Sequence, residues 1–347
     1  MCYIKYIIIL MTKHIKNPFV ISFVFLIFSI IFLSIFFNKI SRDNLSEQIQ
    51  HRQQLAVRSG AKSIGSFLRA VGRSVSVLSS DPSQERLDRF VESWKDDGVT
   101  GIISVNKNGK VAVASNRESK QDLGADVSDR NYFKWAKTAS RGDYFIDTPV
   151  ISKVGSSKDK YIVTVSVPVL DEKNNFNGVL VSAILVTDLV DLHLDNLKVL
   201  DSSKLYLVSN NGEMIYSDQE DLVGHNFKDI FTSDFLGKEK VLQIISSELK
   251  SEAETKVKIA LPNGEEASKL SPYLISASPV KLEDQLWKVV ISVPEKDLNV
   301  FTFNFFNKQI LAVFAAVTVF ILLTLRYSKD AGYDQAVVDE HQKHNIV

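Results

Sequence analysis

Two stretches of this 347-residue chain follow one plan and decide its fold: IISVNKNGKVAVASNRESKQDLGADV at 102–127 and LYLVSNNGEMIYSDQEDLVGHNF at 205–227. Each begins with a run typical of a strand, turns at an Asn-Gly pair and continues with a second run of the same kind. An acidic loop, an Asp-Leu pair and a glycine follow in both. Because order and turn chemistry match together, we predict a module that occurs twice.

A second pair of stretches extends the repeat toward the C-terminus. YIVTVSVPVLDEKNNFNGVLVSAILVTDL at 161–189 is echoed by YLISASPVKLEDQLWKVVISVPEKDL at 273–298. Polar turns such as GSSKD and DEKNN separate the β-branched runs, which predicts antiparallel sheets with helices before and between the strands. The fold class is therefore α+β with two modules. Only the first carries the long middle segment around 128–145, which favours one binding copy and one structural copy.

A long helix is predicted over 41–80, before the first module. The segment contains no proline, and SRDNLSEQIQHRQQ at 41–54 is polar nearly all round. We expect this part to form a stalk that pairs with its twin in a homodimer. The second part carries one apolar stripe at helical spacing, formed by Ile64, Phe67, Leu68, Val71, Val75 and Leu78.

Two apolar runs flank these modules. FVISFVFLIFSIIFLSIFF at 19–37 contains no charged residue, and the run at 310–325 is extended by Phe305 and Phe306. A bilayer requires about 20 apolar residues, so we predict transmembrane helices at 19–37 and 305–325. The alternative for the first run is the core of a cleaved signal peptide, but no small-residue cleavage site follows it.

This topology predicts a bacterial inner-membrane protein with both ends in the cytoplasm and its central region outside. Long polar segments cross membranes largely regardless of their charge. Basic residues precede the first run and follow the second, which favours cytoplasmic ends. Met1 and Met11 are both possible starts. The expected segments are a cytoplasmic N-terminus at 1–18, a transmembrane helix at 19–37, a stalk helix at 38–80, a first module at 81–200, a second module at 201–304, a transmembrane helix at 305–325 and a cytoplasmic tail at 326–347.

The composition argues against several classes of function. Lysine and arginine number 41, as do aspartate and glutamate, so we expect no nucleic-acid partner. The six histidines form no metal-ligating pattern, and Cys2 is the only cysteine, so we expect neither a metal site nor an internal disulfide. No nucleophile elbow, phosphate loop or paired-carboxylate motif occurs. We therefore expect no cofactor and no enzymatic activity.

The middle segment SDRNYFKWAKTASRGDYF at 128–145 concentrates an arginine and several aromatic rings. Arg130 offers a planar fork of donors that matches a carboxylate in two places. A mostly apolar wall with a few convergent polar groups is the usual make-up of a small-molecule pocket. We predict that the ligand-binding residues are Arg130, Tyr132, Phe133, Trp135, Tyr144 and Asp147.

Structural roles for the same residues remain open. Arg130 could pair with Asp129 or Asp143 on the surface. The phenylalanine and tryptophan could fill the core, and Asp147 could cap or pair locally.

The ordered set of motifs resembles the double Cache family of extracytoplasmic sensor domains. The motifs are DRNYFKWA, TPVIS, YIVTVSVPVLDEKNNFNGVLVSAI and LYLVSNNGEMIYS, and the resemblance covers roughly 38–300. It implies two PAS-like modules on one long helix, with the membrane-distal module first, as in chemoreceptors, sensor histidine kinases and diguanylate cyclases. It also implies that a small ligand such as an amino acid, an organic acid or an amine binds the distal module.

The amino-acid-binding subgroup has an arginine, two aromatic residues, a tyrosine and an aspartate late in the last strand. Arg130, Tyr132, Phe133 and Tyr144 resemble the first parts of that pattern, but Ala183 occupies the position of the late aspartate. The group that would hold an α-ammonium is therefore missing. Among organic acids and amino-acid-like compounds, a carboxylate without an amine becomes the favoured ligand.

We therefore expect a membrane-anchored sensor that binds a small anionic metabolite and passes the signal to a cytoplasmic output partner. Residues 326–347 are too few for an output domain, so a truncated receptor remains a second possibility. An alternative from another class is a two-span assembly protein such as a polysaccharide co-polymerase. Those proteins have long external helices and a proline-rich second span, whereas this chain is rich in strands and has no proline there.

Overall fold

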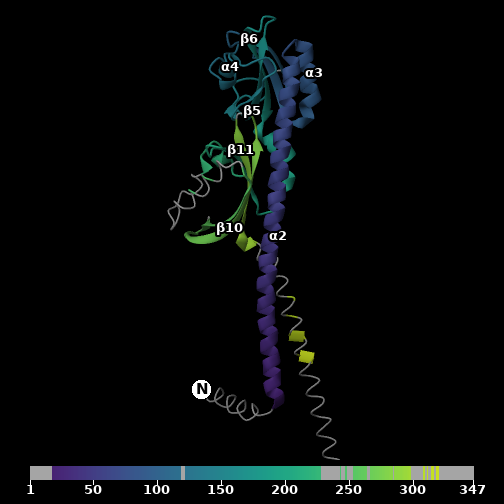
Figure 1. The fold of residues 1–347 in the computed structure, drawn as a ribbon, viewed down its shortest axis with the longest axis vertical. Helices are drawn as coiled ribbons and strands as arrows, with labels where there is room; N and C mark the ends of the chain where they lie inside the picture. Colours follow the sequence, from purple (N-terminus) through teal and green to yellow (C-terminus); the bar gives the residue numbers. More distant parts are fainter. Residues whose placement is uncertain are drawn as a thin grey trace, which may run out of the picture. The chain divides into compact units, whose positions relative to one another are not determined.

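The computed structural model describes residues 18–118, 122–227, 253–263, 266–283 and 285–297, with a few isolated positions elsewhere (Figure 1). The predicted tail at 326–347, residues 1–17 and most of the predicted second span lie outside the described residues. The chain divides into two units, Met1–Glu47 with Lys296–Val347 and Gln48–Glu295. Both sheets belong to the second unit.

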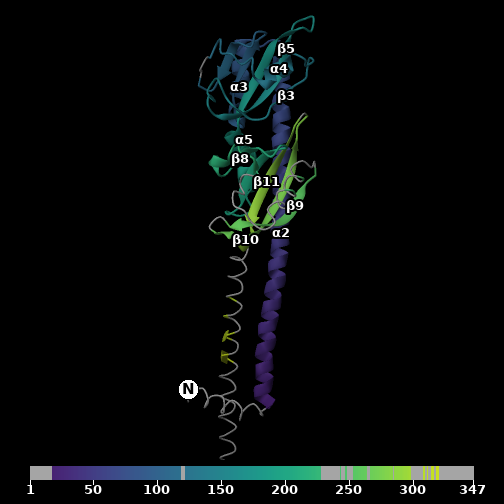
Figure 2. The same ribbon diagram turned by 90° about the vertical axis from the view of Figure 1, so that its left-hand side faces the viewer.

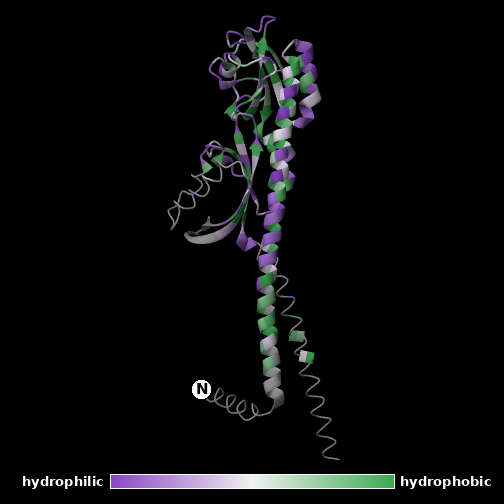
Figure 3. Ribbon diagram, viewed as in Figure 1, coloured by the Kyte–Doolittle hydropathy of each residue, from purple (hydrophilic) through white to green (hydrophobic). Residues whose placement is uncertain are grey.

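The long N-terminal helix is confirmed and begins earlier than the predicted stalk. It is α2 (Pro18–Leu78), and the predicted apolar stripe is buried at Ile64, Leu68, Val71 and Val75. Hydrophobic residues gather along the N-terminal part of α2, and hydrophilic residues follow (Figure 3). In the part of the chain that the structure describes, no helix combines the length and the apolar character needed to cross a membrane.

The first module is an antiparallel sheet with helices on both sides. Its strand order is β2-β1-β6-β5-β3, and β4 also pairs with β5. α3 packs against β1 and β2, and α4 packs against β5 and β6 from the other side (Figure 1). Its elements are α3 (Gln84–Trp94), η1 (Lys95–Asp97), β1 (Val99–Asn106), β2 (Val111–Asn116), α4 (Asn131–Ala136), β3 (Phe145–Ile146), β4 (Val150–Ile151), β5 (Tyr161–Leu170), β6 (Phe176–Leu185) and α5 (Val186–His193).

The second module repeats this topology (Figure 2). Its strand order is β8-β7-β11-β10-β9, so each sheet has its first hairpin at one edge and its last strand in the centre. The predicted repeat is therefore confirmed, as are two antiparallel sheets. The elements are η2 (Asp195–Leu197), β7 (Lys204–Ser209), β8 (Met214–Ser217), η3 (Glu220–Leu222), β9 (Thr255–Asn263), β10 (Glu266–Lys281) and β11 (Leu286–Pro294).

Glycine is required at the hairpin turn that opens each module. Gly109 and Gly212 have φ of +77° and +89°, a region that side chains with a Cβ rarely adopt. A Cβ on Gly109 would lie 2.4 Å from the Cβ of Ser128. The Asn-Gly pairs of the sequence repeat therefore mark the two equivalent turns.

The polar stretch of α2 contacts the second module, which the sequence did not predict. The Gln54 amide nitrogen donates to the carbonyl oxygen of Ala277 at 3.3 Å, and Arg58 Nη2 donates to Glu254 at 2.6 Å. Gln53 is fully buried. A hydropathy pattern does not reveal such a contact, because amide side chains can enter an interface by bonding to strand carbonyls.

Candidate ligand-binding site

A cavity of about 40 Å³ lies in the first module, beside the face of the sheet that α4 covers. Two cations, Arg130 and Lys153, contribute to its wall, and no aspartate or glutamate does. The remaining wall is apolar or carries neutral hydroxyl and amide groups. The lining residues are Thr100, Gly101, Ile102, Ile103, Ser115, Asn116, Val127, Arg130, Tyr132, Val150, Ser152, Lys153, Val154, Gly155, Ser156, Ser157, Ile162, Thr164, Val181 and Ala183.

Arg130 lies at the N-cap of α4, where the chain is extended before the helix begins. Its Nη2 donates to the carbonyl oxygen of Ile151 at 2.7 Å, which leaves four of the five guanidinium donors for other partners. The alternative of a surface pair with a neighbouring aspartate does not occur. Asp129 accepts from Lys153 Nζ at 2.7 and 2.8 Å, and Asp143 accepts from the backbone N–H of Ser140.

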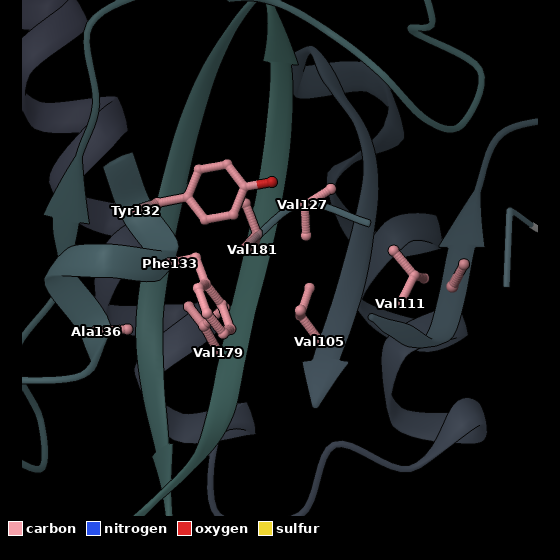
Figure 4. Close-up of a cluster of buried hydrophobic side chains, with 9 residues drawn as sticks. Val105, Val111, Val127, Tyr132, Phe133, Ala136, Val179 and Val181 are labelled. Carbon is pink, nitrogen blue, oxygen red and sulfur yellow. The ribbon is translucent and has the colours of Figure 1, made fainter. Parts of the chain in front are cut away.

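Tyr132 and Phe133 lie in the first turn of α4 and are both buried in the cluster above the sheet (Figure 4). The Tyr132 ring lines the cavity and lies near Val127 and Val181 in this view. Burial raises the pKa of Tyr132, so its hydroxyl remains a protonated donor. Phe133 instead packs edge-to-face against Phe176, at 5.6 Å between ring centroids, and lies outside the lining.

Trp135 and Tyr144 do not reach the cavity. The Trp135 ring stacks on Phe145 at 5.2 Å between centroids, as its core alternative predicted. The Tyr144 ring lies against Gly72 of α2, where an added Cβ would be 2.6 Å from the ring. Burial and then a hydrogen bond with Glu283 raise the pKa of Tyr144. The structure therefore turns Tyr144 toward the helix and the second module.

Asp147 lies beside the cavity without lining it. The side chain is 2% exposed, and its Oδ1 accepts from the backbone N–H of Thr148 at 2.9 Å. Burial raises the pKa of Asp147, while hydrogen bonds and the charge of Arg130 act in the opposite direction. The carboxylate is thus committed to local partners, in line with its structural alternative.

One row of residues across the sheet forms the floor of the cavity. The backbone N–H of Asp147 donates to the carbonyl oxygen of Thr164 at 3.0 Å, and Thr164 pairs with Ala183 on β6. Ala183 in turn pairs with Gly101, and Gly101 with Asn116. Directly opposed residues of antiparallel strands present their side chains on the same face. The small residues in the middle of the row leave the space that larger side chains would fill.

The loop after β4 forms the rim opposite this floor. Ser156 Oγ donates to the carbonyl oxygen of Thr100 at 3.2 Å, and Ser157 Oγ lies 3.2 Å from Ser152 Oγ. The backbone N–H of Gly155 donates to Asp122. Sequence reasoning treated GSSKD as a turn and missed these residues. Their only signal was a cluster of small polar residues directly after TPVIS.

Comparisons with known proteins relate this geometry to sensor domains. A family model described as "Cache domain" matches residues 38–300. The ligand-binding domain of the Pseudomonas fluorescens chemoreceptor CtaA, solved with L-leucine, is 13% identical over 74% of this chain and 97% of that chain, with a TM-score of 0.51. That of the Pseudomonas aeruginosa PAO1 chemoreceptor PctB, solved with L-Gln, is 16% identical over 72% and 90%, with a TM-score of 0.50. At these identities the likeness concerns the fold alone.

A third solved structure is much longer than the matched region. This chain spans 39% of the length of an extracellular ligand binding receptor from Desulfohalobium retbaense DSM5692, at 12% identity over 72% of this chain and a TM-score of 0.46. No curated protein matches the chain.

Proposed function

This chain belongs to the Cache domain family, and from that premise we propose that it is a sensor whose first module binds a small organic anion. The cavity in that module carries the proposal, because two cations and no acidic side chain line it. The two chemoreceptor domains of similar fold were solved with amino acids, which supports a small-molecule ligand. The wall of this cavity favours the carboxylate part of such a ligand and contains no carboxylate to pair with its ammonium group.

The charge of the wall decides between an amino acid and a simple acid. An ammonium group taken out of water needs a carboxylate or several acceptors near it. Asp147 is close but is held by Thr148 and does not line the cavity. A carboxylate, in contrast, meets the free donors of Arg130 and the hydroxyl of Tyr132. A charge-assisted hydrogen bond of this kind contributes about 1.5–3 kcal/mol.

The size of the cavity favours a compact ligand. A volume of about 40 Å³ holds roughly three water molecules, since each requires about 10–15 Å³ on this measure. An acid with a two- or three-carbon skeleton is therefore a closer fit than a branched amino acid. Larger ligands would require the loop at 150–157 to move.

Membrane anchoring and signal transfer belong to the same proposal. The run at 19–37 is free of charge, and Phe25, Phe28 and Phe32 are exposed on α2, as expected of side chains that face lipid. α2 is continuous from Pro18 to Leu78, and Gly72 on this helix touches Tyr144 of the first module. A ligand that changes the first module would shift α2 by about 1–2 Å and thereby act on a cytoplasmic output partner.

We propose binding without catalysis at this cavity. No histidine, aspartate or glutamate lines it, so the serine and threonine hydroxyls there have no general base among the lining residues. The only amine in the wall, that of Lys153, is held by Asp129. The homodimer is proposed from the predicted pairing of the stalk.

Calorimetry of the full chain tests the proposed function. The titrants are acetate, propionate, lactate, pyruvate, glycine and alanine. We expect at least one acid to bind more tightly than the amino acids, and Arg130→Ala to weaken its binding by about 10-fold to 100-fold, because one or two charge-assisted hydrogen bonds are lost. Arg141→Ala is the matched control, since Arg141 lies in the same module but bonds to Asn174 and Asp171. Acid binding that is unchanged in Arg130→Ala would refute the site.

A further inference from the structure

One buried hydroxyl in the wall of the cavity has no partner. Thr164 is 2% exposed, and its Oγ1 makes no hydrogen bond with any described residue. Its neighbours differ in this respect, since Thr100 Oγ1 donates to the carbonyl oxygen of Ala183 at 3.0 Å and Ser166 Oγ to that of Phe145 at 3.3 Å. A buried hydroxyl without a partner costs free energy, which a valine of the same shape would avoid.

Thr164 lies in the wall of the cavity, so its hydroxyl is within reach of whatever occupies it. Thr164 lies in the middle of β5, opposite Ala183, and both line the cavity. The side chain of Ala183 has no polar group, and the carboxylate of nearby Asp147 accepts from Thr148. The remaining candidates for a partner of Thr164 Oγ1 are a bound ligand or a water molecule.

We propose that Thr164 Oγ1 bonds a second oxygen of the ligand, so that the site selects a short hydroxy acid or keto acid over the plain acid of equal length. This inference rests on the proposed function, in which Arg130 holds the carboxylate. Arg130 and Thr164 line the same small cavity, so one compact molecule can contact both. A hydroxyl can donate or accept, and it therefore suits either a ligand hydroxyl or a ligand carbonyl.

Lactate, pyruvate and propionate separate this proposal from the proposed function. All three have three carbons and one carboxylate, and only propionate lacks the second oxygen. The affinity of each for the full chain is measured by calorimetry in the wild type and in Thr164→Val. We expect lactate or pyruvate to bind the wild type about 10-fold more tightly than propionate, because one ligand hydrogen bond contributes about that factor. In Thr164→Val this ratio falls to about one, while propionate binding stays within about 2-fold.

Two further variants control for structural effects. Thr100→Val removes a hydroxyl from the same cavity that already has a backbone partner, so the ratio should persist. Thr164→Ser keeps the hydroxyl and should keep the ratio, even if Thr164→Val fails to fold.

The outcomes distinguish the two proposals. If all three acids bind the wild type equally, Thr164 does not contact the ligand, and the partner of its hydroxyl is a water molecule. That result would overturn the role of Thr164 but would not affect the proposed anion site. A ratio that persists in Thr164→Val or that disappears in Thr164→Ser would also overturn it. Failure of every acid to bind would overturn the proposed function and this inference together.

Discussion

The two sheets share one strand order, but the space above them is used differently. In the first module Ile103 and Thr164 line a cavity, and α4 with its loops forms the opposite wall. In the second module the repeat places Tyr206 where the first has Ile103, and the Tyr206 ring packs edge-to-face on Phe227 at 5.5 Å between centroids. A duplicated sheet thus sets the frame, and the side chains above it decide whether a ligand has room.

Both modules contain buried hydroxyls on their central strands. Strand pairing aligns Ala183 of β6 with Ser292 of β11, and Thr164 of β5 with Ile275 of β10. Ser292 shares a hydrogen bond with Tyr206, whose pKa burial raises. Ser292 of the second module thus has a partner, whereas Thr164 Oγ1 of the first module and Ser276 Oγ of the second have none among the described residues.

α2 also contacts the modules with different chemistry. Its apolar stripe lies beside the first module, where the Phe67 ring meets Trp94 at 5.9 Å between centroids. Its polar stretch meets the second module through Gln54 and Arg58, and both amide atoms of Gln53 are buried without a partner among the described residues. At this second contact, unpaired buried amide atoms offset part of the gain from burial.

Removing a buried ring from the second module should have the largest effect on the free energy of unfolding. Phe227→Ala removes one ring of the pair that fills the space above the sheet, so we expect the free energy of unfolding to fall by about 3–5 kcal/mol. Urea denaturation of the full chain measures it. A loss below about 1 kcal/mol would show that the ring does not fill the second module.

Replacing an unpaired amide in the polar contact of α2 should change the free energy of unfolding less and in the opposite direction. Gln53→Leu replaces two unpaired amide atoms with a side chain of similar size, so the free energy of unfolding should rise by about 1–3 kcal/mol. Gln54→Leu is the matched control on the same face. It removes the hydrogen bond to Ala277 and should give less stabilisation or none. If Gln53→Leu destabilises the chain, the amide has a partner and the difference between the two contacts disappears.

The smallest expected effect is a pH dependence of stability that arises from Asp147, at the edge of the cavity floor. Because burial raises the pKa of Asp147 above its ordinary value of 3.8, the folded state binds this proton more tightly than the unfolded state. The contribution to stability is present below pH 3.8 and is lost as pH rises through the raised pKa. Melting temperatures of the wild type should therefore fall relative to Asp147→Asn over that interval. A relative gain of the wild type with rising pH would mean that hydrogen bonds, not burial, dominate at this carboxyl.

Part of the candidate site could be predicted from the sequence, and the remainder could not for identifiable reasons. Arg130 and Tyr132 could be predicted because a guanidinium beside aromatic rings is typical of a small-molecule pocket, and both line the cavity. Trp135 and Tyr144 have the right chemistry but point elsewhere, since side-chain direction depends on packing that residue type does not encode. Thr164 was hidden in a strand where a threonine is unremarkable by propensity.

By itself, the sequence determined the long helix, the two antiparallel sheets and their repeat, because hydrophobic period and Asn-Gly turns act over a few residues and need no distant partner. Only the tertiary structure decided that the loop at 150–157 meets the floor of β1, β5 and β6 to enclose a cavity, and that Gln53 is buried. These features depend on contacts between segments far apart in the chain, and local patterns carry no information about which of them meet.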